Sequence, residues 1–397
     1  MRELPFEYAI RNLGRSPGRL LMSAAGSAIV VLLVMAAGGF IEGMDRALRT
    51  SGSDRNAILL GAGSEESIER SEIPMRTPGI AAASIAGVAR IAGVDAVSPE
   101  IHAALPVIVA EAADDGPTET TRETAANTVV RGVRPEAFLV HREVRVIAGR
   151  TPETGGDEVA IGRLAARGLG FDPPTTALDA SLVIDDRPFR LVGVLAADGG
   201  VVEGEVWMPL SDLLIVSQRD TLSCVALSTT TTDHRAIEAF AATRLDLELA
   251  ALRESEYYAA LSDFFGPVRL MVTATAVLVA AGGVVGGLNT TYAAFASRTR
   301  EIGTLRTLGF GRGAILRSFV VESILTAATG GIIAAFVARE LLDGLAIRFS
   351  MGVFGIAIGP EVVAVGLLSG LVLGIVGAVL PAWRCLRLPV PEALRSA

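Results

Sequence analysis

Four long apolar stretches constrain this chain more than any other feature of its sequence. Three carry no charged residue and one carries a single Glu: residues 20–41, 270–296, 362–383 and, with Glu322, 319–338. A helix needs roughly 20 apolar residues to cross the hydrocarbon core of a bilayer, where every backbone polar group must be satisfied within the segment. The sequence therefore predicts four transmembrane helices. The first stretch is too long for the apolar part of a cleaved signal peptide, which favours a retained anchor.

The remainder of the chain requires a sizeable water-soluble part. The 397 residues are 51% hydrophobic, yet 20% are charged, and residues 45–265 contain no apolar run longer than a strand. We therefore predict an integral membrane α-helical protein with four transmembrane helices and a large extracytoplasmic mixed α/β domain inserted between the first and the second. Strand-like runs in this domain are residues 57–60, 106–109, 128–131 and 189–194, and helix-like runs are residues 81–91, 157–169 and 233–245.

The placement of arginine predicts the orientation of the chain. Residues 1–19, 297–317 and 384–397 together hold twelve Arg and four Glu, whereas residues 42–268 hold 20 Arg against 35 Asp and Glu. Basic residues are enriched in the short cytoplasmic segments of membrane proteins. Both termini and the loop after the second span are therefore expected in the cytoplasm, and the acidic domain outside.

These observations predict an order of nine segments along the chain. Helical patterns at residues 42–48 and 252–265 predict that the first two spans continue outward as a stalk, and residues 112–125 are turn-rich and expected to form a loop. The segments are an amphipathic cytoplasmic helix (1–19), the first span (20–41), the outer domain with its stalk (42–268), the second span (269–296), a cytoplasmic helix and loop (297–317), the third span (318–338), a short outer loop (339–361), the fourth span (362–383) and a cytoplasmic tail (384–397).

No pattern in the sequence predicts a catalytic or metal site. His102, His141 and His234 lie far apart and lack the spacing of metal ligands. The phosphate-binding loop of ATPases needs a lysine, and all 35 basic residues of this chain are Arg. We therefore expect no enzyme activity, metal or cofactor in this chain, and expect any ATP and Mg²⁺ to be bound by another polypeptide. Cys224 and Cys385 are predicted on opposite sides of the membrane, where they cannot pair.

Glycines recur four residues apart in two of the spans, and Glu322 lies one turn into the third. Small residues at this spacing let helix backbones approach closely. The pattern fits packing within the chain and a dimer interface equally well, with candidates Gly282, Gly286, Gly366, Gly370 and Gly374. Because Glu322 is shallow and Arg317, Arg300 or Arg306 could reach it, a structural ion pair, first of all with Arg317, is favoured over a proton relay.

The loop between the second and third spans has the most informative pattern. Ile302, Leu305 and Leu308 are spaced for a short amphipathic helix that ends at Gly309. Such a helix suits docking into a cleft of a soluble partner, whereas pairing with anionic lipid headgroups would explain only its arginines. The predicted docking residues are Arg298, Arg300, Glu301, Ile302, Gly303, Leu305, Arg306, Leu308 and Gly309.

This loop resembles the cytoplasmic motif of the FtsX-like and MacB-like permeases, the four-span membrane subunits of ABC systems. Further resemblances to that family cover the N-terminal helix, the entry of the third span and the C-terminal signature, at residues 8–13, 319–323, 381–384 and 391–395. The outer domain resembles the MacB-type periplasmic core domain, with short matches in the expected order at residues 130–133, 149–150, 157–162, 191–194 and 207–210.

The resemblance implies a membrane subunit in the bacterial inner membrane that docks one ATPase through residues 298–313 and pairs with a second permease subunit, as a homodimer or heterodimer. ATP hydrolysis in the partner would then move the outer domain, for export or extraction of a lipid, lipoprotein, peptide or drug-like substrate. A periplasmic adaptor protein is a further partner that this family allows, and no nucleic acid is expected. The alternative is an FtsX-like regulatory scaffold that controls a cell-wall enzyme and transports nothing. A sensing receptor and a membrane-bound hydrolase fit less well, because the sequence shows neither a signalling module nor a catalytic constellation.

Overall fold

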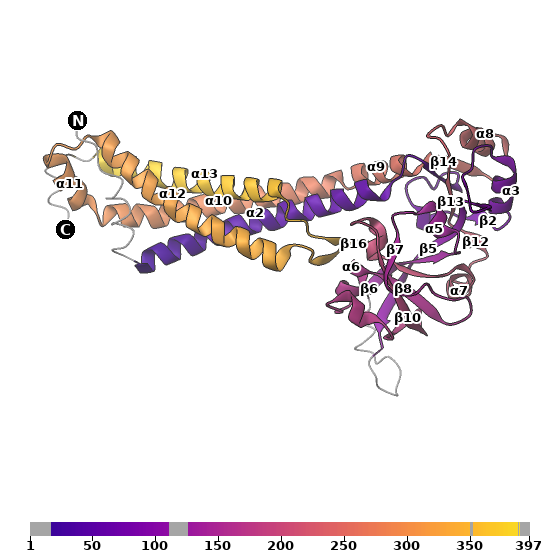
Figure 1. Cartoon of the computed structure of the whole chain (residues 1–397). Helices are drawn as coiled ribbons and strands as arrows, with labels where there is room; N and C mark the ends of the chain where they lie inside the picture. Colours follow the sequence, from indigo (N-terminus) through magenta and orange to yellow (C-terminus); the bar gives the residue numbers. More distant parts are fainter. Residues whose placement is uncertain (1–16, 111–125, 350–351, 388, 390–397) are drawn as a thin grey trace. The chain divides into compact units, whose positions relative to one another are not determined.

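The four apolar stretches form four long helices in the computed structural model of the chain (Figure 1). The structure describes all residues except 1–16, 111–125, 350–351, 388 and 390–397. The predicted amphipathic helix before residue 17 and the predicted loop at residues 112–125 therefore lie outside the described residues. The chain divides into two compact units. The helical unit comprises Met1–Glu42, Pro267–Gly344 and Ile356–Ala397, and the insert unit comprises Gly43–Gly266 and Leu345–Gly355.

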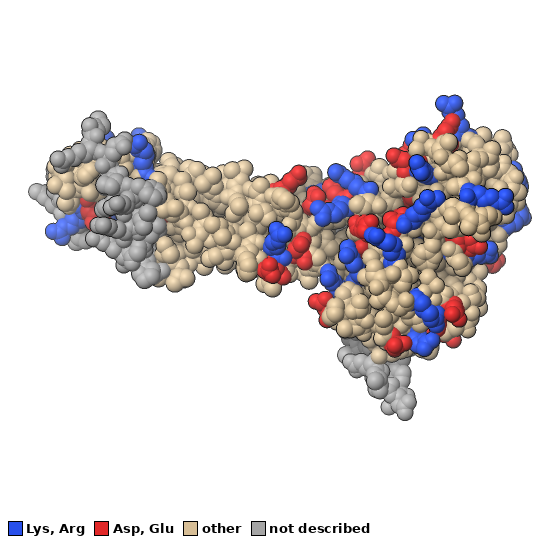
Figure 2. Space-filling view, viewed as in Figure 1, with Lys and Arg blue, Asp and Glu red and all other residues tan. Residues whose placement is uncertain are grey.

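The helical unit confirms the prediction of four spans. Four helices among the described residues are long and apolar enough to cross a membrane. They are α2 (Pro17–Ser51), α10 (Gly266–Ala296), α12 (Arg312–Val337), which continues as the π-helix η4 (Ala338–Leu342), and α13 (Pro360–Leu386). Figure 1 shows these helices running side by side, and Figure 2 shows no charged side chain over the middle of their visible face. A short helix, α11 (Thr299–Thr307), joins α10 to α12.

Glycines allow close packing of the helices within this unit. This is one of the two interpretations that the four-residue glycine spacing left open, the other being a dimer interface. A Cβ on Gly366 would lie 2.5 Å from the Met35 side chain of α2, and one on Gly374 would lie 2.9 Å from the Ala327 Cβ of α12. Gly370 likewise faces Val31, 2.9 Å from its would-be Cβ. The glycine face of α13 is therefore occupied by helices of the same chain.

The second glycine face is different. No described atom lies within 4 Å of a Cβ built on Gly282 or Gly286 of α10, and both residues are exposed. Gly283, one residue along, instead faces Val30 of α2, with a would-be Cβ distance of 2.5 Å. Packing among the described residues therefore accounts for Gly283 and leaves the Gly282–Gly286 face without a neighbour from that part of the chain.

The insert unit confirms the predicted mixed α/β domain, inserted between the first and second spans. Within the described residues, ten strands form one sheet in the order β14-β1-β13-β5-β6-β11-β8-β10-β7, and β9 pairs with both β10 and β5. The β8–β10 and β6–β11 pairs are parallel and the others antiparallel. The strands are β1 (Asn56–Gly61), β5 (Val97–Val109), β6 (Ala126–Val133), β7 (Arg145–Gly149), β8 (Glu158–Gly162), β9 (Ser181–Ile184), β10 (Arg187–Ala196), β11 (Val206–Pro209), β13 (Cys224–Ser228) and β14 (Leu249–Arg253).

Helices and small strand pairs complete the insert unit around this sheet. Its core is a large cluster of buried aliphatic residues that includes Leu59, Ile101, Leu191 and Val225. The helices are α3 (Thr77–Ser84), α5 (Ala137–Val140), α6 (Arg163–Gly168), α7 (Leu210–Val216), α8 (Arg235–Thr243) and α9 (Glu254–Phe264); the 3₁₀ turns are η1 (Ile68–Arg70), η2 (Pro174–Ala177) and η3 (Val201–Gly204); the small pairs are β2 (Ile73–Pro74) with β12 (Thr221–Leu222) and β3 (Arg90–Ile91) with β4 (Val94–Asp95).

Three helix predictions in this unit were partly wrong. Residues 157–169 begin with the fully buried strand β8, and only α6 is helical, because a short continuous apolar run fits a buried strand as well as a helix. Residues 81–91 leave α3 after Ser84, and Gly87 has a φ of +90°, which turns the chain toward β3. The predicted helix 252–265 begins at Glu254, because Leu252 and Arg253 belong to β14.

The predicted short outer loop at residues 339–361 contains a β-hairpin that the sequence analysis missed. β15 (Ala346–Phe349) pairs with β16 (Gly352–Gly355), and the hairpin belongs to the insert unit. The Arg348 Nη2 group donates a 2.7 Å hydrogen bond to the Gly168 carbonyl, and Phe354 packs among Met44 and Tyr258. The insert unit is therefore completed by residues that lie between the third and fourth spans in the sequence.

Candidate functional site

The candidate docking helix α11 ends in a glycine-based cap. Gly309 has a φ of +91°, and its N–H donates to the Arg306 carbonyl while the N–H of Phe310 donates to the Leu305 carbonyl, both at 3.2 Å. This pair of bonds is the Schellman motif, which requires a left-handed residue just past the helix end. Leu305 and Phe310 also pack against the same apolar cluster. The sequence therefore ends α11 by geometry that a side chain at residue 309 would strain.

One face of α11 is anchored inside the helical unit. Ile302 is 1% exposed and packs in a cluster that joins α10, α12 and α13. This cluster contains the rings of Phe295 and Phe319, which are tilted by 47° with their centroids 4.7 Å apart. Gly303 is buried beside it, and Leu305 is partly buried on the same cluster. Ile302, Gly303 and Leu305 therefore hold α11 against its own spans, and their contact with a partner stays a prediction.

The opposite face of α11 is available to a partner. Arg300, Glu301 and Thr304 are exposed, and Leu308, which follows the last helical residue, is 60% exposed. The sequence predicted Ile302, Leu305 and Leu308 on one apolar face. That alignment breaks because residues three apart drift by about 60° per step around a helix, and because the helix ends before Leu308.

An ion pair ties the start of this segment to the third span. The Arg298 Nη1 atom lies 3.2 Å from both carboxylate oxygens of Glu322, and both side chains are mostly buried. Arg298 was also predicted as a docking residue, and that role stays a prediction. Arg317 as a partner of Glu322 stays a prediction.

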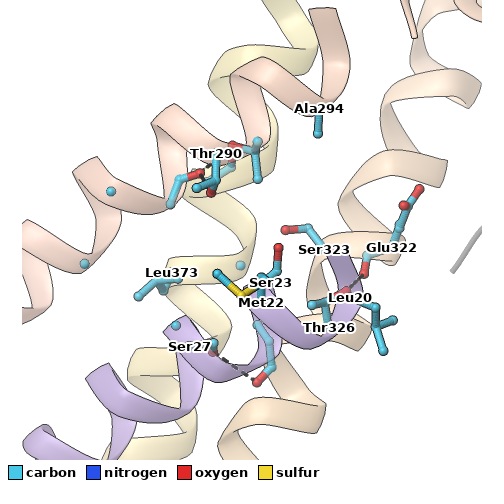
Figure 3. Close-up of a pocket in the computed structure, with 18 of the residues that line it drawn as sticks. Leu20, Met22, Ser23, Ser27, Thr290, Ala294, Glu322, Ser323, Thr326 and Leu373 are labelled. Carbon is cyan, nitrogen blue, oxygen red and sulfur yellow. Dashed lines mark hydrogen bonds between the residues drawn. The ribbon is translucent and has the colours of Figure 1, made fainter. Parts of the chain in front are cut away.

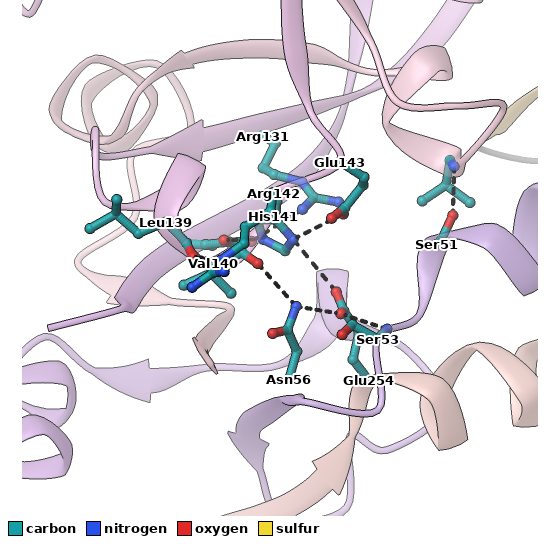
Figure 4. A network of polar contacts seen from close by, with 12 residues as sticks. Ser51, Ser53, Asn56, Arg131, Leu139, Val140, His141, Arg142, Glu143 and Glu254 are labelled. Atoms are coloured by element: carbon teal, nitrogen blue, oxygen red, sulfur yellow. Dashed lines mark hydrogen bonds and ion pairs between the residues drawn. The ribbon is translucent and has the colours of Figure 1, made fainter. Parts of the chain in front are cut away.

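The insert unit contains a buried charged network that the sequence analysis missed (Figure 4). Glu100 of β5 lies at its centre, with its Oε1 atom 2.8 Å from His141 Nε2 and its Oε2 atom 3.2 Å from His102 Nε2 and 3.3 Å from Arg131 Nη1. Arg131 also contacts Glu205, with its Nη2 atom 2.7 Å from Oε1. The fold thus brings together two histidines that are 39 positions apart in the sequence.

The network continues to the segments that follow α2 and precede α9. The Glu254 carboxylate, at the start of α9, accepts hydrogen bonds from Asn56 Nδ2 at 2.9 Å and from the backbone N–H of Ser53 at 3.1 Å. Its other oxygen lies 3.6 Å from His141 Nδ1. The imidazole of His141 therefore bridges Glu100 of the sheet and Glu254 of α9.

Charge pairing governs the protonation of these buried groups. Burial lowers the pKa of His141, but the adjacent Glu100 carboxylate outweighs it and raises the pKa to about 9. Burial opposes ionisation of Glu100, yet the positive charges of His141 and Arg131 hold its pKa well below the usual range. Burial raises the pKa of Glu254, an effect that His141 only partly offsets. His141 is thus a cation at neutral pH, as a bridge between two carboxylates requires.

Glu100, His102 and Cys224 also bring three metal-ligand atoms within 4.8 Å of one another. The Arg131 guanidinium lies 3.3 Å from one Glu100 oxygen, however, and His141 engages the other. A divalent cation would meet these positive charges at close range. Burial also raises the pKa of the Cys224 thiol, which disfavours the thiolate that a metal needs. The donor set therefore fits an ion-pair network better than a metal centre.

Two family models match the chain, one for each part of its architecture. The model of the MacB-like periplasmic core domain matches residues 20–243, and that of the FtsX-like permease C-terminal region matches residues 273–390. The first match covers more than half of the chain.

Similar curated proteins agree with these models. A macrolide export ATP-binding/permease protein, MacB of Sodalis glossinidius, is 23% identical over 98% of this chain and 60% of its own length. The uncharacterized ABC transporter permease YknZ of Bacillus subtilis is 24% identical over 69% of this chain and 71% of its own. The periplasmic region of MacB from Actinobacillus actinomycetemcomitans aligns with 54% of this chain and 95% of its own at a TM-score of 0.39 and 11% identity. The chain spans less than two thirds of the MacB relatives it matches.

The MacB-like match covers the first span and most of the insert unit, and the FtsX-like match covers the last three spans, in the order of elements described above. The chain therefore belongs to the MacB/FtsX-like family of ABC transporter permeases.

Proposed function

We propose that this chain is the membrane subunit of an ABC complex and docks a separate ATPase through the exposed face of α11. The observation that carries this proposal is the division of α11 into an anchored face at Ile302 and an exposed face at Glu301, Thr304 and Leu308. A docking helix must be held rigidly to its own spans in order to pass on a displacement. The partner binds ATP and Mg²⁺, consistent with the absence of lysine from this chain.

The buried network supports a mechanical role for the insert unit. Glu254 joins α9 to the segment after α2 and, through His141, to the central strand β5. A displacement of α2 or α9 would therefore move the sheet as well, because these buried contacts connect both helices to β5. We infer that ATP hydrolysis in the partner drives movement of this domain, for export or extraction of a lipid, lipoprotein, peptide or drug-like substrate.

The exposed Gly282–Gly286 face of α10 supports pairing with a second permease subunit. Small residues four apart allow close approach of helices in a membrane, and no described residue of this chain occupies that face. The proposed location is the bacterial inner membrane, with the arginine-rich α11 segment and both termini in the cytoplasm.

Affinity purification of the tagged full-length chain from its bacterium, in mild detergent, tests the docking proposal. We expect a stoichiometric ATPase subunit that carries a Gly-x-x-x-x-Gly-Lys phosphate loop. Leu308→Asp should reduce its recovery by about tenfold or more, because a charge at the centre of an interface removes a dominant contact.

Leu245→Asp is the matched control, because Leu245 is an exposed leucine of the insert unit, 80% exposed against 60% for Leu308. This variant should retain the ATPase at the wild-type level. Undiminished recovery with Leu308→Asp combined with Thr304→Arg would rule out docking through α11.

A further inference from the structure

The helical unit encloses a pocket that the docking proposal does not use. It has a volume of about 570 Å³ and lies between α2, α10, α12 and α13 (Figure 3). Glycines on its walls, among them Gly286 of α10 and Gly377 of α13, leave the space open, because no described atom lies within 4 Å of a Cβ on either. This volume is within the range of ligand-binding pockets, about 300–1,000 Å³.

The position of the pocket determines which molecules can reach it. Its walls include Ser27, Gly286 and Ala327, which lie inside the apolar stretches of three spans. Met22 of α2 lines the pocket and is also exposed on the surface of the unit, on a helix other than α10. In a bilayer that surface faces lipid, so the pocket is open to acyl chains.

One end of the pocket is polar. Arg298 and Glu322 line it there, and Figure 3 shows Ser23 and Ser323 directed into it from α2 and α12. Arg298 gives one nitrogen, Nη1, to Glu322. Its Nε and Nη2 groups, and the hydroxyls of Ser23 and Ser323, have no hydrogen-bond partner among the described residues. These groups are donors for the phosphate and ester oxygens of a lipid headgroup.

The charge at this end selects the headgroup. Residues 297–317 contain five Arg and one Glu, and α13 ends in the same region with Arg384. Clusters of arginine next to a span attract anionic lipids. We propose that the pocket is a binding site for an anionic glycerophospholipid, with one acyl chain between the four helices and the phosphate at Arg298. This site does not depend on ATPase docking.

Photolabelling of the full-length chain in mild detergent tests the proposal. The probe is phosphatidylglycerol with a photoreactive diazirine on one acyl chain, and labelled peptides are located by mass spectrometry. We expect labelling on α10 between residues 286 and 294 and on α12 between residues 323 and 327. Gly286→Leu should reduce it by roughly tenfold, because a leucine side chain displaces about two chain methylenes, each worth about 0.8 kcal/mol.

Gly282→Leu is the matched control. It lies one turn from Gly286 on the same exposed face of α10, has the same open surroundings and does not line the pocket. Because both substitutions would affect a dimer face alike, only occupation of the pocket predicts a loss specific to Gly286→Leu. Equal labelling of the two variants would overturn the proposal.

The headgroup is tested separately. Arg298→Gln should reduce labelling by phosphatidylglycerol about tenfold, the value of one charge-assisted hydrogen bond, and leave labelling by the matching diacylglycerol probe unchanged. An equal loss with both probes would refute the role of Arg298 as a phosphate donor. Absence of labelling on α10 and α12 in the wild type would refute the lipid site.

Discussion

At the scale of single residues, burial decides how much a charged contact is worth. Arg131 Nη2 and Arg145 Nη2 each lie 2.7 Å from a carboxylate oxygen, of Glu205 and Asp198 respectively. The side chains of the first pair are 3% and 7% exposed, and those of the second 66% and 69%. Removing one partner of a buried pair leaves an uncompensated charge, whereas water replaces the lost partner at the surface.

Arg131→Met should therefore destabilise the insert unit by about 3–5 kcal/mol. Arg145→Met, in which the contact distance is the same, should cost less than about 1 kcal/mol. Hydrogen exchange of the β5 and β6 amides in the intact protein measures both changes as local opening energies. Similar costs for the two variants would mean that the network contributes no more than a surface pair.

The charge on His141 also predicts a pH dependence. Its pKa is raised from 6.5 to about 9 in the folded state, so its contribution to stability is complete below about pH 6.5 and is lost as the pH rises through about 9. Thermal unfolding of the insert unit, followed by circular dichroism, should occur at a lower temperature at pH 9 than at pH 6.5. His141→Asn should be less stable at pH 6.5 and should lose most of this difference. A difference of the same size in the variant would assign it to other groups.

The network shows why sequence reasoning missed these residues. His102 and Arg131 meet because β5 and β6 pair in that register, and His141 reaches Glu100 from α5. Such contacts depend on long-range pairing that no local pattern encodes. The available signal was a charged residue inside an apolar strand, as at Arg131 in the predicted strand 128–131. Buried charges are rare unless paired, so this residue could have been singled out.

At the scale of elements, helix contacts in the helical unit depend on where each glycine faces. A Cβ on Gly330 of α12 would lie 2.4 Å from the Ala24 carbonyl oxygen of α2, a backbone atom that cannot yield. A Cβ on Gly282 would meet no described atom within 4 Å. The four-residue spacing identified Gly366, Gly370 and Gly374 but missed Gly330, because the residues four before and four after it, Thr326 and Ala334, are not glycine.

Gly330→Leu should therefore separate α2 from α12, and Gly282→Leu should not. We expect the first variant to aggregate or to lose its melting transition in mild detergent, and the second to keep a cooperative melting transition, because its leucine meets no described atom of its own chain. Cross-linking between cysteines placed at Ser27 and Ala327 reports the contact directly, because the Ser27 hydroxyl of α2 donates a 3.4 Å hydrogen bond to the Ala327 carbonyl of α12. Retention of that cross-link in Gly330→Leu would contradict the predicted separation.

Elements set by local chemistry were predictable, and elements set by distant contacts were not. The spans follow from hydropathy alone, and α11 follows from its periodicity and Gly309. The inward direction of Ile302 depends on the cluster of Phe295 and Phe319, which belong to neighbouring helices. The β15–β16 hairpin also depends on distant contacts. Its strands are short, and it joins the insert unit through Arg348 and Phe354.

At the scale of the whole molecule, the arrangement of charge along the chain predicts its orientation. The arginine-rich segment at residues 297–317 is proposed in the cytoplasm, and the acidic insert unit outside. Both native cysteines, Cys224 and Cys385, are buried and free, at 1% and 6% exposure. Because both thiols are poorly accessible, thiol reagents should label them little compared with cysteines introduced at exposed positions in each unit.

Leu245→Cys and Leu308→Cys place a thiol on each predicted side, since these leucines are exposed in the insert unit and beside α11. With a membrane-impermeant maleimide on spheroplasts, we expect Leu245→Cys to be labelled at once and Leu308→Cys only after the membrane is permeabilised. The wild type should stay largely unlabelled in both conditions. The reverse pattern would place α11 outside the cell, where no ATP-driven subunit could dock, and would exclude the proposed coupling whatever the affinity of α11 for a partner. Because positive charge in short loops dominates insertion, whereas the acidic residues of a long domain contribute little, the twelve arginines of the short segments decide this outcome.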